Sequence, residues 1–114
     1  MSTALLVRAA CEDVAKKQIE ALNLYCEKHG IEVVGQPLVF REKSCDVRRV
    51  ENFCMENEGR IDMVLCVDFN RISRSVVEIV EFCHTLYNKG VKVCSTAENG
   101  AIFSLANMLY RFGE

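Results

Sequence analysis

Arginines stand at several points where a predicted apolar segment gives way to a polar one. Arg8 follows the first apolar run, Arg48 and Arg49 open a predicted helix after a polar loop, and Arg71 and Arg74 follow the central apolar run. A guanidinium group stays charged and donates two parallel hydrogen bonds to a pair of phosphate oxygens. Taken singly, each arginine is explained as an exposed surface residue or as a partner of a nearby carboxylate. If the fold brings these segments to one edge, together they indicate a site for a phosphate or phosphodiester.

The first half of the chain predicts a strand, a helix and an extended segment. The apolar run at 3–7 is typical of a buried strand. After it the apolar residues recur at helical spacing, and Gly30 is placed to end that helix; the stripe consists of Ala15, Ile19, Leu22 and Cys26. Residues 31–40 then predict a second extended segment, broken or bent by Gly35 and Pro37.

The second half predicts a short helix, a central strand and two further helices around a fourth strand. Asp46 can cap a helix that ends near 58–60 and buries Val47, Val50 and Phe53 or Cys54. Residues 61–69 predict the central strand, 70–74 the turn that leaves it, and 91–94 the fourth strand. The helix between these strands has a stripe of Val76, Ile79 or Val80, Cys83, and Leu86 or Tyr87. A last helix after Asn99-Gly100 has a stripe of Ile102, Leu105 or Ala106, Leu109 and Phe112.

Strands therefore alternate with helices along the chain. This order predicts an α/β domain with a mostly parallel sheet of four or five strands, helices on both faces, and right-handed crossovers. Ligands of such sheets bind beyond the carboxyl ends of the strands, near the point where the strand order reverses. In this sequence those ends carry residues 8–10, 41–45, 70–74 and 95–98.

Composition predicts one soluble cytoplasmic domain over residues 1–114, with no cofactor. Half of the residues are hydrophobic, and the net charge of −2 argues against a surface that wraps nucleic acid all round. No apolar run approaches the roughly 20 residues that span a bilayer, so we expect no membrane contact. The 7 cysteines form no CxxC pair and no zinc spacing. We expect most of them to be small buried side chains in a reducing compartment, without a metal site or a disulfide framework.

Two motifs in this arrangement resemble those of serine site-specific recombinases of the resolvase/invertase type. The segment 6–11 is similar to the family's first motif, an aromatic residue followed by x-Arg-Val-Ser-Thr, and Gln18 matches a glutamine on the family's first helix. The second motif of the family, an acidic-lead strand running into Leu-Asp-Arg-Leu-x-Arg, resembles 59–65 followed by 68–75. Counting back from Asp62 places Arg48 at a family arginine that follows a mobile Ser/Gly loop, here reduced to 43–45. The resemblance covers nearly the whole chain and implies a three-layer resolvase-like fold.

The resemblance also implies roles for individual residues. In the family, a serine hydroxyl attacks a DNA phosphodiester to form a covalent phosphoserine, and several arginines stabilise the transition state. Ala10 stands at the nucleophile position and Asn70 at that of an aspartate, while Leu6 replaces the aromatic residue. The matching arginines are Arg8, Arg48, Arg71 and Arg74. Two losses at one site suggest inactivity by descent, and a single serine-to-alanine change could also be engineered.

Neighbouring side chains offer weaker substitutes for the missing hydroxyl. Cys11 is a good nucleophile in kind, but it is one residue out of register and is more simply a packed thiol. Asp68 more simply pairs with an arginine. His29 and His84 lie in or beside predicted helices, away from the site.

The resulting expectation is a recombinase-type domain that binds a DNA phosphodiester through its arginines and does not cleave it. Family members continue into a long dimer helix and a separate DNA-binding module; residues 1–114 contain no such module, so we expect weak DNA affinity. The last helix is expected to form a homodimer or to bind an active recombinase. The main alternative is a protein-interaction module with incidental arginines. A phosphate-binding enzyme on a flavodoxin-like sheet ranks last, because no Gly-rich loop follows the first strand.

Overall fold

A computed structural model describes residues 2–57 and 61–98 of the chain. Its strands are β1 (Ser2–Arg8), β2 (Glu32–Val33), β3 (Leu38–Phe40), β4 (Met63–Cys66) and β5 (Lys92–Ser95). Its α-helices are α1 (Glu12–His29), α2 (Val47–Glu56) and α3 (Val76–Tyr87), and two 3-10 turns, η1 (Phe69–Arg71) and η2 (Thr96–Glu98), follow β4 and β5. The predicted last helix lies outside the described residues.

All pairings between these strands are parallel, and they form one sheet of five strands in the order β2-β1-β4-β5, with β3 also paired to β1. The chain therefore moves from β1 to one side of the sheet and returns past it to reach β4. Strand order reverses between β1 and β4, so ligands are expected at the carboxyl ends of these two strands.

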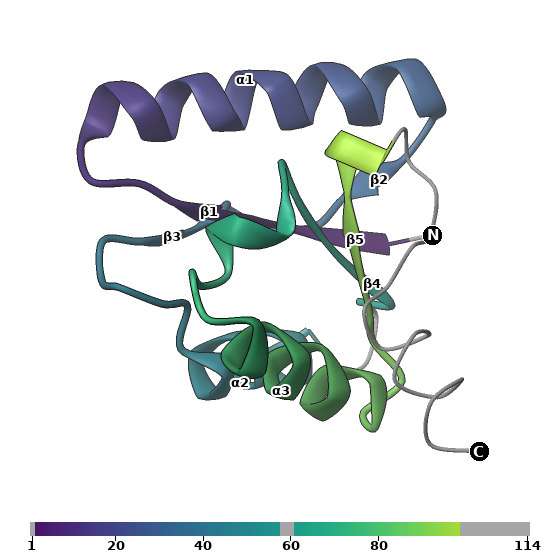
Figure 1. Cartoon of the computed structure of the whole chain (residues 1–114). Helices are drawn as coiled ribbons and strands as arrows, with labels where there is room; N and C mark the ends of the chain where they lie inside the picture. The colour runs from purple at the N-terminus through teal and green to yellow at the C-terminus, as the bar shows by residue number, and fades with distance from the viewer. Residues whose placement is uncertain (1, 58–60, 99–114) are drawn as a thin grey trace.

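The helices cover both faces of this sheet. Figure 1 shows α1 on one face and α2 with α3 on the other. Successive strand residues point to opposite faces: Leu5 and Val7 join the core beneath α1, whereas Ala4 and Leu6 join the core beneath α2 and α3. The three-layer α/β fold predicted from the alternating elements is confirmed.

The first helix ends where the sequence predicts, at Gly30. Ala15, Leu22 and Cys26 are buried along its inner face, together with the polar Gln18. Gly30 adopts φ +63° and its backbone N–H closes the helix on the Cys26 carbonyl, a left-handed conformation that glycine adopts at little cost.

The extended segment 31–40 is broken at Gly35, as predicted, since Gly35 turns the chain at φ +70° and leaves two short strands. Two other local predictions need correction. The central strand ends at Cys66 and not at Phe69, since residues 69–71 wind into η1. On α3, Val76 is exposed although it was predicted to be buried, and Phe82, which the predicted stripe did not include, is buried.

The cysteine prediction is confirmed for burial. Six of the thiols are buried, and Cys11 alone is exposed. Within residues 2–57 and 61–98, no cluster of three or more His, Cys, Asp or Glu side chains is arranged to hold a metal ion. Among the described helices, none has the length and apolar character needed to cross a bilayer.

Candidate functional site

The end of β1 is tied to the segment that follows β4 through the side chain of Arg8. Its Nε donates to the backbone carbonyl of Arg71 at 2.9 Å, and its Nη2 donates to the carbonyl of Asn70 at 2.8 Å. These two bonds cross the switch point of the sheet. They hold the guanidinium plane in one orientation, because both donors belong to the same rigid fork.

Gln18 holds the same strand end from the α1 side. Its Nε2 donates to the carbonyl of Arg8 at 3.0 Å, and its side chain is buried. Its Oε1 is also buried and has no hydrogen-bond partner among the described residues. The backbone of Arg8 is thus held by α1 and its side chain by the segment that follows β4.

The segment after β4 is anchored by apolar side chains and by the loop that follows β3. Phe69 and Ile72 are buried, while the carbonyl of Ile72 accepts from the backbone N–H of Cys45 at 2.8 Å. The Cys45 thiol donates to the Arg71 carbonyl at 3.3 Å. Burial raises the pKa of this thiol to about 12, so the thiol keeps its proton at neutral pH and can donate it.

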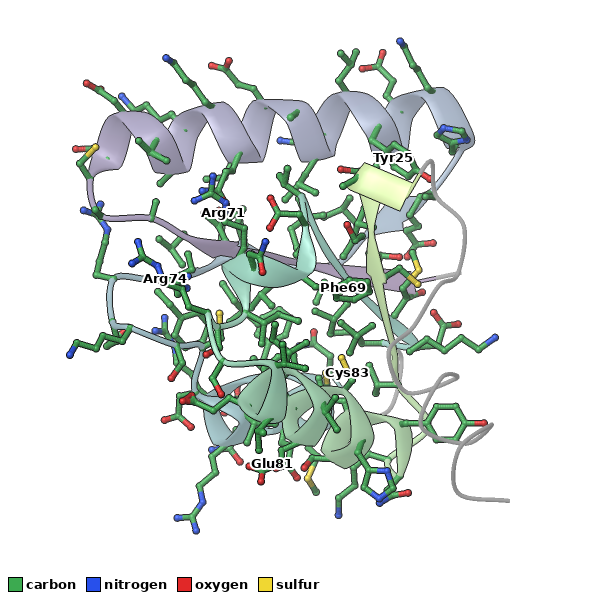
Figure 2. All side chains as sticks on the ribbon, viewed as in Figure 1. Tyr25, Phe69, Arg71, Arg74, Glu81 and Cys83 are labelled. Atoms are coloured by element: carbon green, nitrogen blue, oxygen red, sulfur yellow. The ribbon has the colours of Figure 1, made fainter. Side chains whose placement is uncertain are left out.

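Two adjoining hollows open at this edge of the sheet. The first, which we call the Arg71 hollow, has a volume of about 340 Å³ and is lined by Arg8, Ala9, Ala10, Asp68, Asn70, Arg71 and Arg74. The second, the Lys43 hollow, has about 530 Å³ and is lined by Arg8, Ala9, Ala10, Arg41, Glu42, Lys43, Ser73, Arg74, Ser75 and Glu78. Residues 8–10 and Arg74 belong to both. In Figure 2, Arg71 and Arg74 lie at the end of the molecule where β1 runs into α1.

Most of the predicted site residues meet here. Arg8, Ala10 and Arg74 line both hollows, and Asn70 and Arg71 line one. Gln18 reaches the site through the Arg8 backbone. Arg48 does not join them: it is exposed in the first turn of α2, and it lines neither hollow.

Sequence reasoning did not single out Arg41 and Lys43 as site residues, although it placed the segment 41–45 at a strand end. Both side chains are exposed on the loop after β3 and line the Lys43 hollow. The sequence did contain a signal for them. Arg41 and Lys43 directly follow the extended segment 31–40, and strands joined by helices are expected to be parallel, so their ends share one edge of the sheet.

Arg49 has a structural role beside this loop. Its Nη1 donates to the Val39 carbonyl at 3.3 Å, and its guanidinium carbon lies 4.8 Å from the centre of the Phe40 ring. This side chain therefore contacts β3 through both a hydrogen bond and the Phe40 ring.

Each carboxylate that lines the hollows has a hydrogen-bond or ion-pair partner. Glu42 accepts from the Arg41 backbone N–H at 2.9 Å, and Glu78 accepts from the Ser73 hydroxyl at 3.3 Å. In the part of the chain that the structure describes, ion pairs join only Lys16 to Glu12 and Arg71 to Asp68, the latter at 3.8 Å. Arg41, Lys43 and Arg74 thus have no carboxylate partner among the described residues, and the edge favours an anion.

Three of the other candidates line neither hollow, whereas Asp68 lines one of them. Cys11 is exposed at the start of α1 and lines neither of them. His29 stacks against Tyr25 with ring centroids 4.2 Å apart, at the far end of α1. His84 lies on α3. Asp68 is paired with Arg71, as expected, and lines the Arg71 hollow.

Comparison with known families decides what this arrangement belongs to. The family model described as the resolvase N-terminal domain matches residues 6–109. The chain belongs to this family. Its arginine-lined edge is therefore the edge of a resolvase-type serine recombinase domain. A search of curated proteins gave no significant match.

Solved structures confirm the fold of this resolvase domain. The N-terminal catalytic domain of TP901-1 integrase is similar with a TM-score of 0.69 and 21% identity, covering 100% of this chain and 99% of that one. A resolvase family site-specific recombinase from Streptococcus pneumoniae gives 0.72 and 14%, with coverages of 99% and 87%. The C-terminal catalytic domain of ISC1926 TnpA, an IS607-like serine recombinase, gives 0.62 and 20%, with coverages of 98% and 82%.

Proposed function

We propose that this resolvase domain binds the phosphodiester backbone of DNA through Arg8, Arg71 and Arg74 and does not cleave it. The observation that carries the proposal is the position of Ala10, which lines both hollows together with Arg8 and Arg74. Its methyl group occupies the place where strand cleavage by the family's chemistry requires an attacking oxygen.

The remaining groups support binding more than chemistry. A covalent intermediate needs a nucleophile, and a methyl group has no electron pair with which to attack phosphorus. Asn70 supplies an amide where the family has a carboxylate, so the site also lacks that group for the proton and arginine network. The arginines retain their charge, and a guanidinium donates charge-assisted hydrogen bonds to phosphate oxygens.

Partners follow from the same reasoning. We propose weak DNA binding by residues 1–114, because a few phosphate contacts give a modest and salt-dependent affinity. We also propose self-association, or association with an active recombinase, through the apolar stripe in 102–112, which rests on the sequence pattern alone. Sedimentation of the chain at high concentration tests it: we expect a dimer that Phe112→Asp weakens, and a strict monomer would contradict it.

Restoring the hydroxyl tests the inactivity. We expect no covalent protein-DNA adduct on a denaturing gel from the unmodified chain joined to a DNA-binding module. Ala10→Ser should give an adduct if Asn70 is tolerated, and Ala10→Ser with Asn70→Asp should give one if it is not.

Ala9→Ser is the matched control, since Ala9 lines the same two hollows but points a buried side chain into the core beneath α1. It should give no adduct. An adduct from the unmodified chain would overturn the proposal, and mapping it to Cys11 would identify that thiol as the nucleophile.

A further inference from the structure

We propose that the Lys43 hollow is a second phosphate subsite, so that the domain holds two consecutive phosphates of one nucleic-acid strand on either side of Arg8 and Arg74. This inference rests on the proposed function, in which the Arg71 hollow takes a phosphodiester. It assigns Arg41 and Lys43 as binding residues for the neighbouring phosphate.

The two hollows are positioned to act as neighbours. They share a common wall made of Arg8, Ala9, Ala10 and Arg74. Beyond this wall the Arg71 hollow is lined by Arg71, and the Lys43 hollow by Arg41 and Lys43. Arg8 is fixed in that wall by its bonds to the carbonyls of Asn70 and Arg71. Volumes of about 340 and 530 Å³ both fall within the roughly 300–1,000 Å³ of small-ligand sites. Each hollow can therefore admit one nucleotide unit.

Four cationic side chains and two carboxylates line the Lys43 hollow, so its net charge favours an anion. Arg41 and Lys43 are exposed and have no ion-pair partner among the described residues. The two acidic residues of this hollow, Glu42 and Glu78, accept from a backbone N–H and a serine hydroxyl instead. The N-terminus of α3, capped by Ser75, also opens on this hollow and adds its positive dipole end.

The loop that carries these two cations is held at both ends. Phe40, which precedes Arg41, accepts from the Ala9 backbone N–H at 3.0 Å. At the other end Ser44 forms a bridge with Ser73, and Cys45 donates to the Ile72 carbonyl. Both anchors belong to segments that line the hollows. Little ordering of the loop is therefore needed on binding, which lowers its entropic cost.

Short oligothymidylates separate one phosphate subsite from two. Dithymidine monophosphate has one phosphodiester and trithymidine diphosphate has two. The full chain is titrated with each at several salt concentrations, and binding is followed by backbone and arginine side-chain NMR shifts.

We expect the two-phosphate ligand to bind about tenfold more tightly, which corresponds to about 1.4 kcal/mol. Its affinity should also fall more steeply with salt concentration than that of the shorter ligand, because two phosphate charges are bound in place of one.

The variants decide which hollow holds which phosphate. Arg41→Ala with Lys43→Ala should reduce the preference to the roughly twofold statistical factor of a ligand with two equivalent phosphates, and should leave affinity for the one-phosphate ligand nearly unchanged. Arg71→Ala should weaken both ligands. Lys28→Ala, an exposed cation at the far end of α1, should change neither.

The results of these titrations test the second subsite separately from the proposed function. A twofold preference in the unmodified chain, or a tenfold preference that survives the double variant, would overturn the second subsite while phosphate binding stands. If neither ligand binds, the proposed function fails, and the second subsite fails with it.

Discussion

The side chain of Arg8 is hydrogen-bonded to the backbone carbonyl of Arg71, a residue 63 positions later in the chain, with 2.9 Å between Nε and oxygen. This bond joins the carboxyl ends of two adjacent parallel strands. Arg8 therefore has two roles, because it is one of the cations of the site and it also holds the arginine-lined edge in shape.

Arg8→Ala should therefore lower stability as well as phosphate affinity. It removes two hydrogen bonds from a charged donor to backbone carbonyls, one part-buried and one exposed, and we expect a loss of about 1–3 kcal/mol in the free energy of unfolding, measured by urea denaturation. Arg8→Lys is the comparison, because an ammonium keeps the charge but cannot donate to both carbonyls from one plane. Equal stability of Arg8→Ala and the unmodified chain would show that these bonds do not hold the edge.

Gly35 is the turn residue at which a side chain should be least tolerated. Its φ is +70°, and a Cβ there would lie 2.7 Å from Cζ of Phe53. Gly35→Ala should cost about 2–4 kcal/mol, from the left-handed backbone and from displacement of the Phe53 ring. Gly30→Ala has a similar φ of +63° with no atom within 4 Å of the added carbon, so it should cost only about 1–2 kcal/mol. Equal losses would assign the whole effect to the backbone.

Cys11 should be the first thiol to react with iodoacetamide in the folded protein. It is exposed, whereas the other six cysteines are buried. At pH 8, mass spectrometry after a short reaction should find one alkyl group, located on residue 11, and Cys11→Ser should abolish this rapid labelling. Rapid labelling of Cys45 would indicate that the loop after β3 opens readily.

Stability should decline as the pH rises above about 9. Burial, together with the neighbouring Cys94, raises the pKa of the Cys83 thiol to about 12, and burial raises the pKa of the Cys45 thiol to about 12 as well. Between pH 9 and 12 these thiols ionise in the unfolded chain but stay protonated in the folded one. Each can therefore remove up to about 1.4 kcal/mol per pH unit.

Urea denaturation at pH 8 and pH 10.5 measures this loss. Cys83→Ala should be less stable than the unmodified chain at pH 8 but should lose less on going to pH 10.5. An identical loss in both proteins would assign the alkaline effect to other groups.

The order of elements was determined by the sequence alone. Apolar runs such as 3–7 and 63–67 are too continuous for a surface strand, and the stripe of Ala15, Leu22 and Cys26 has helical spacing. Parallel strands joined by helices have their carboxyl ends at one edge of the sheet. The sequence alone therefore predicts that Arg8 and Arg71 lie close together.

Tertiary structure alone decided which cations share a hollow and which do not. Residue counting grouped Arg48 with the site, but the cap at Asp46 starts α2 so that Arg48 is exposed and lines neither hollow. Arg41 and Lys43 line the Lys43 hollow because the backbone of Cys45 is bonded to that of Ile72, from a distant segment. Periodicity describes which residues face a sheet or a helix. It does not predict where the side chains of the loop after β3 lie. The path of that loop depends on its contacts with the segment after β4, which is distant in the sequence.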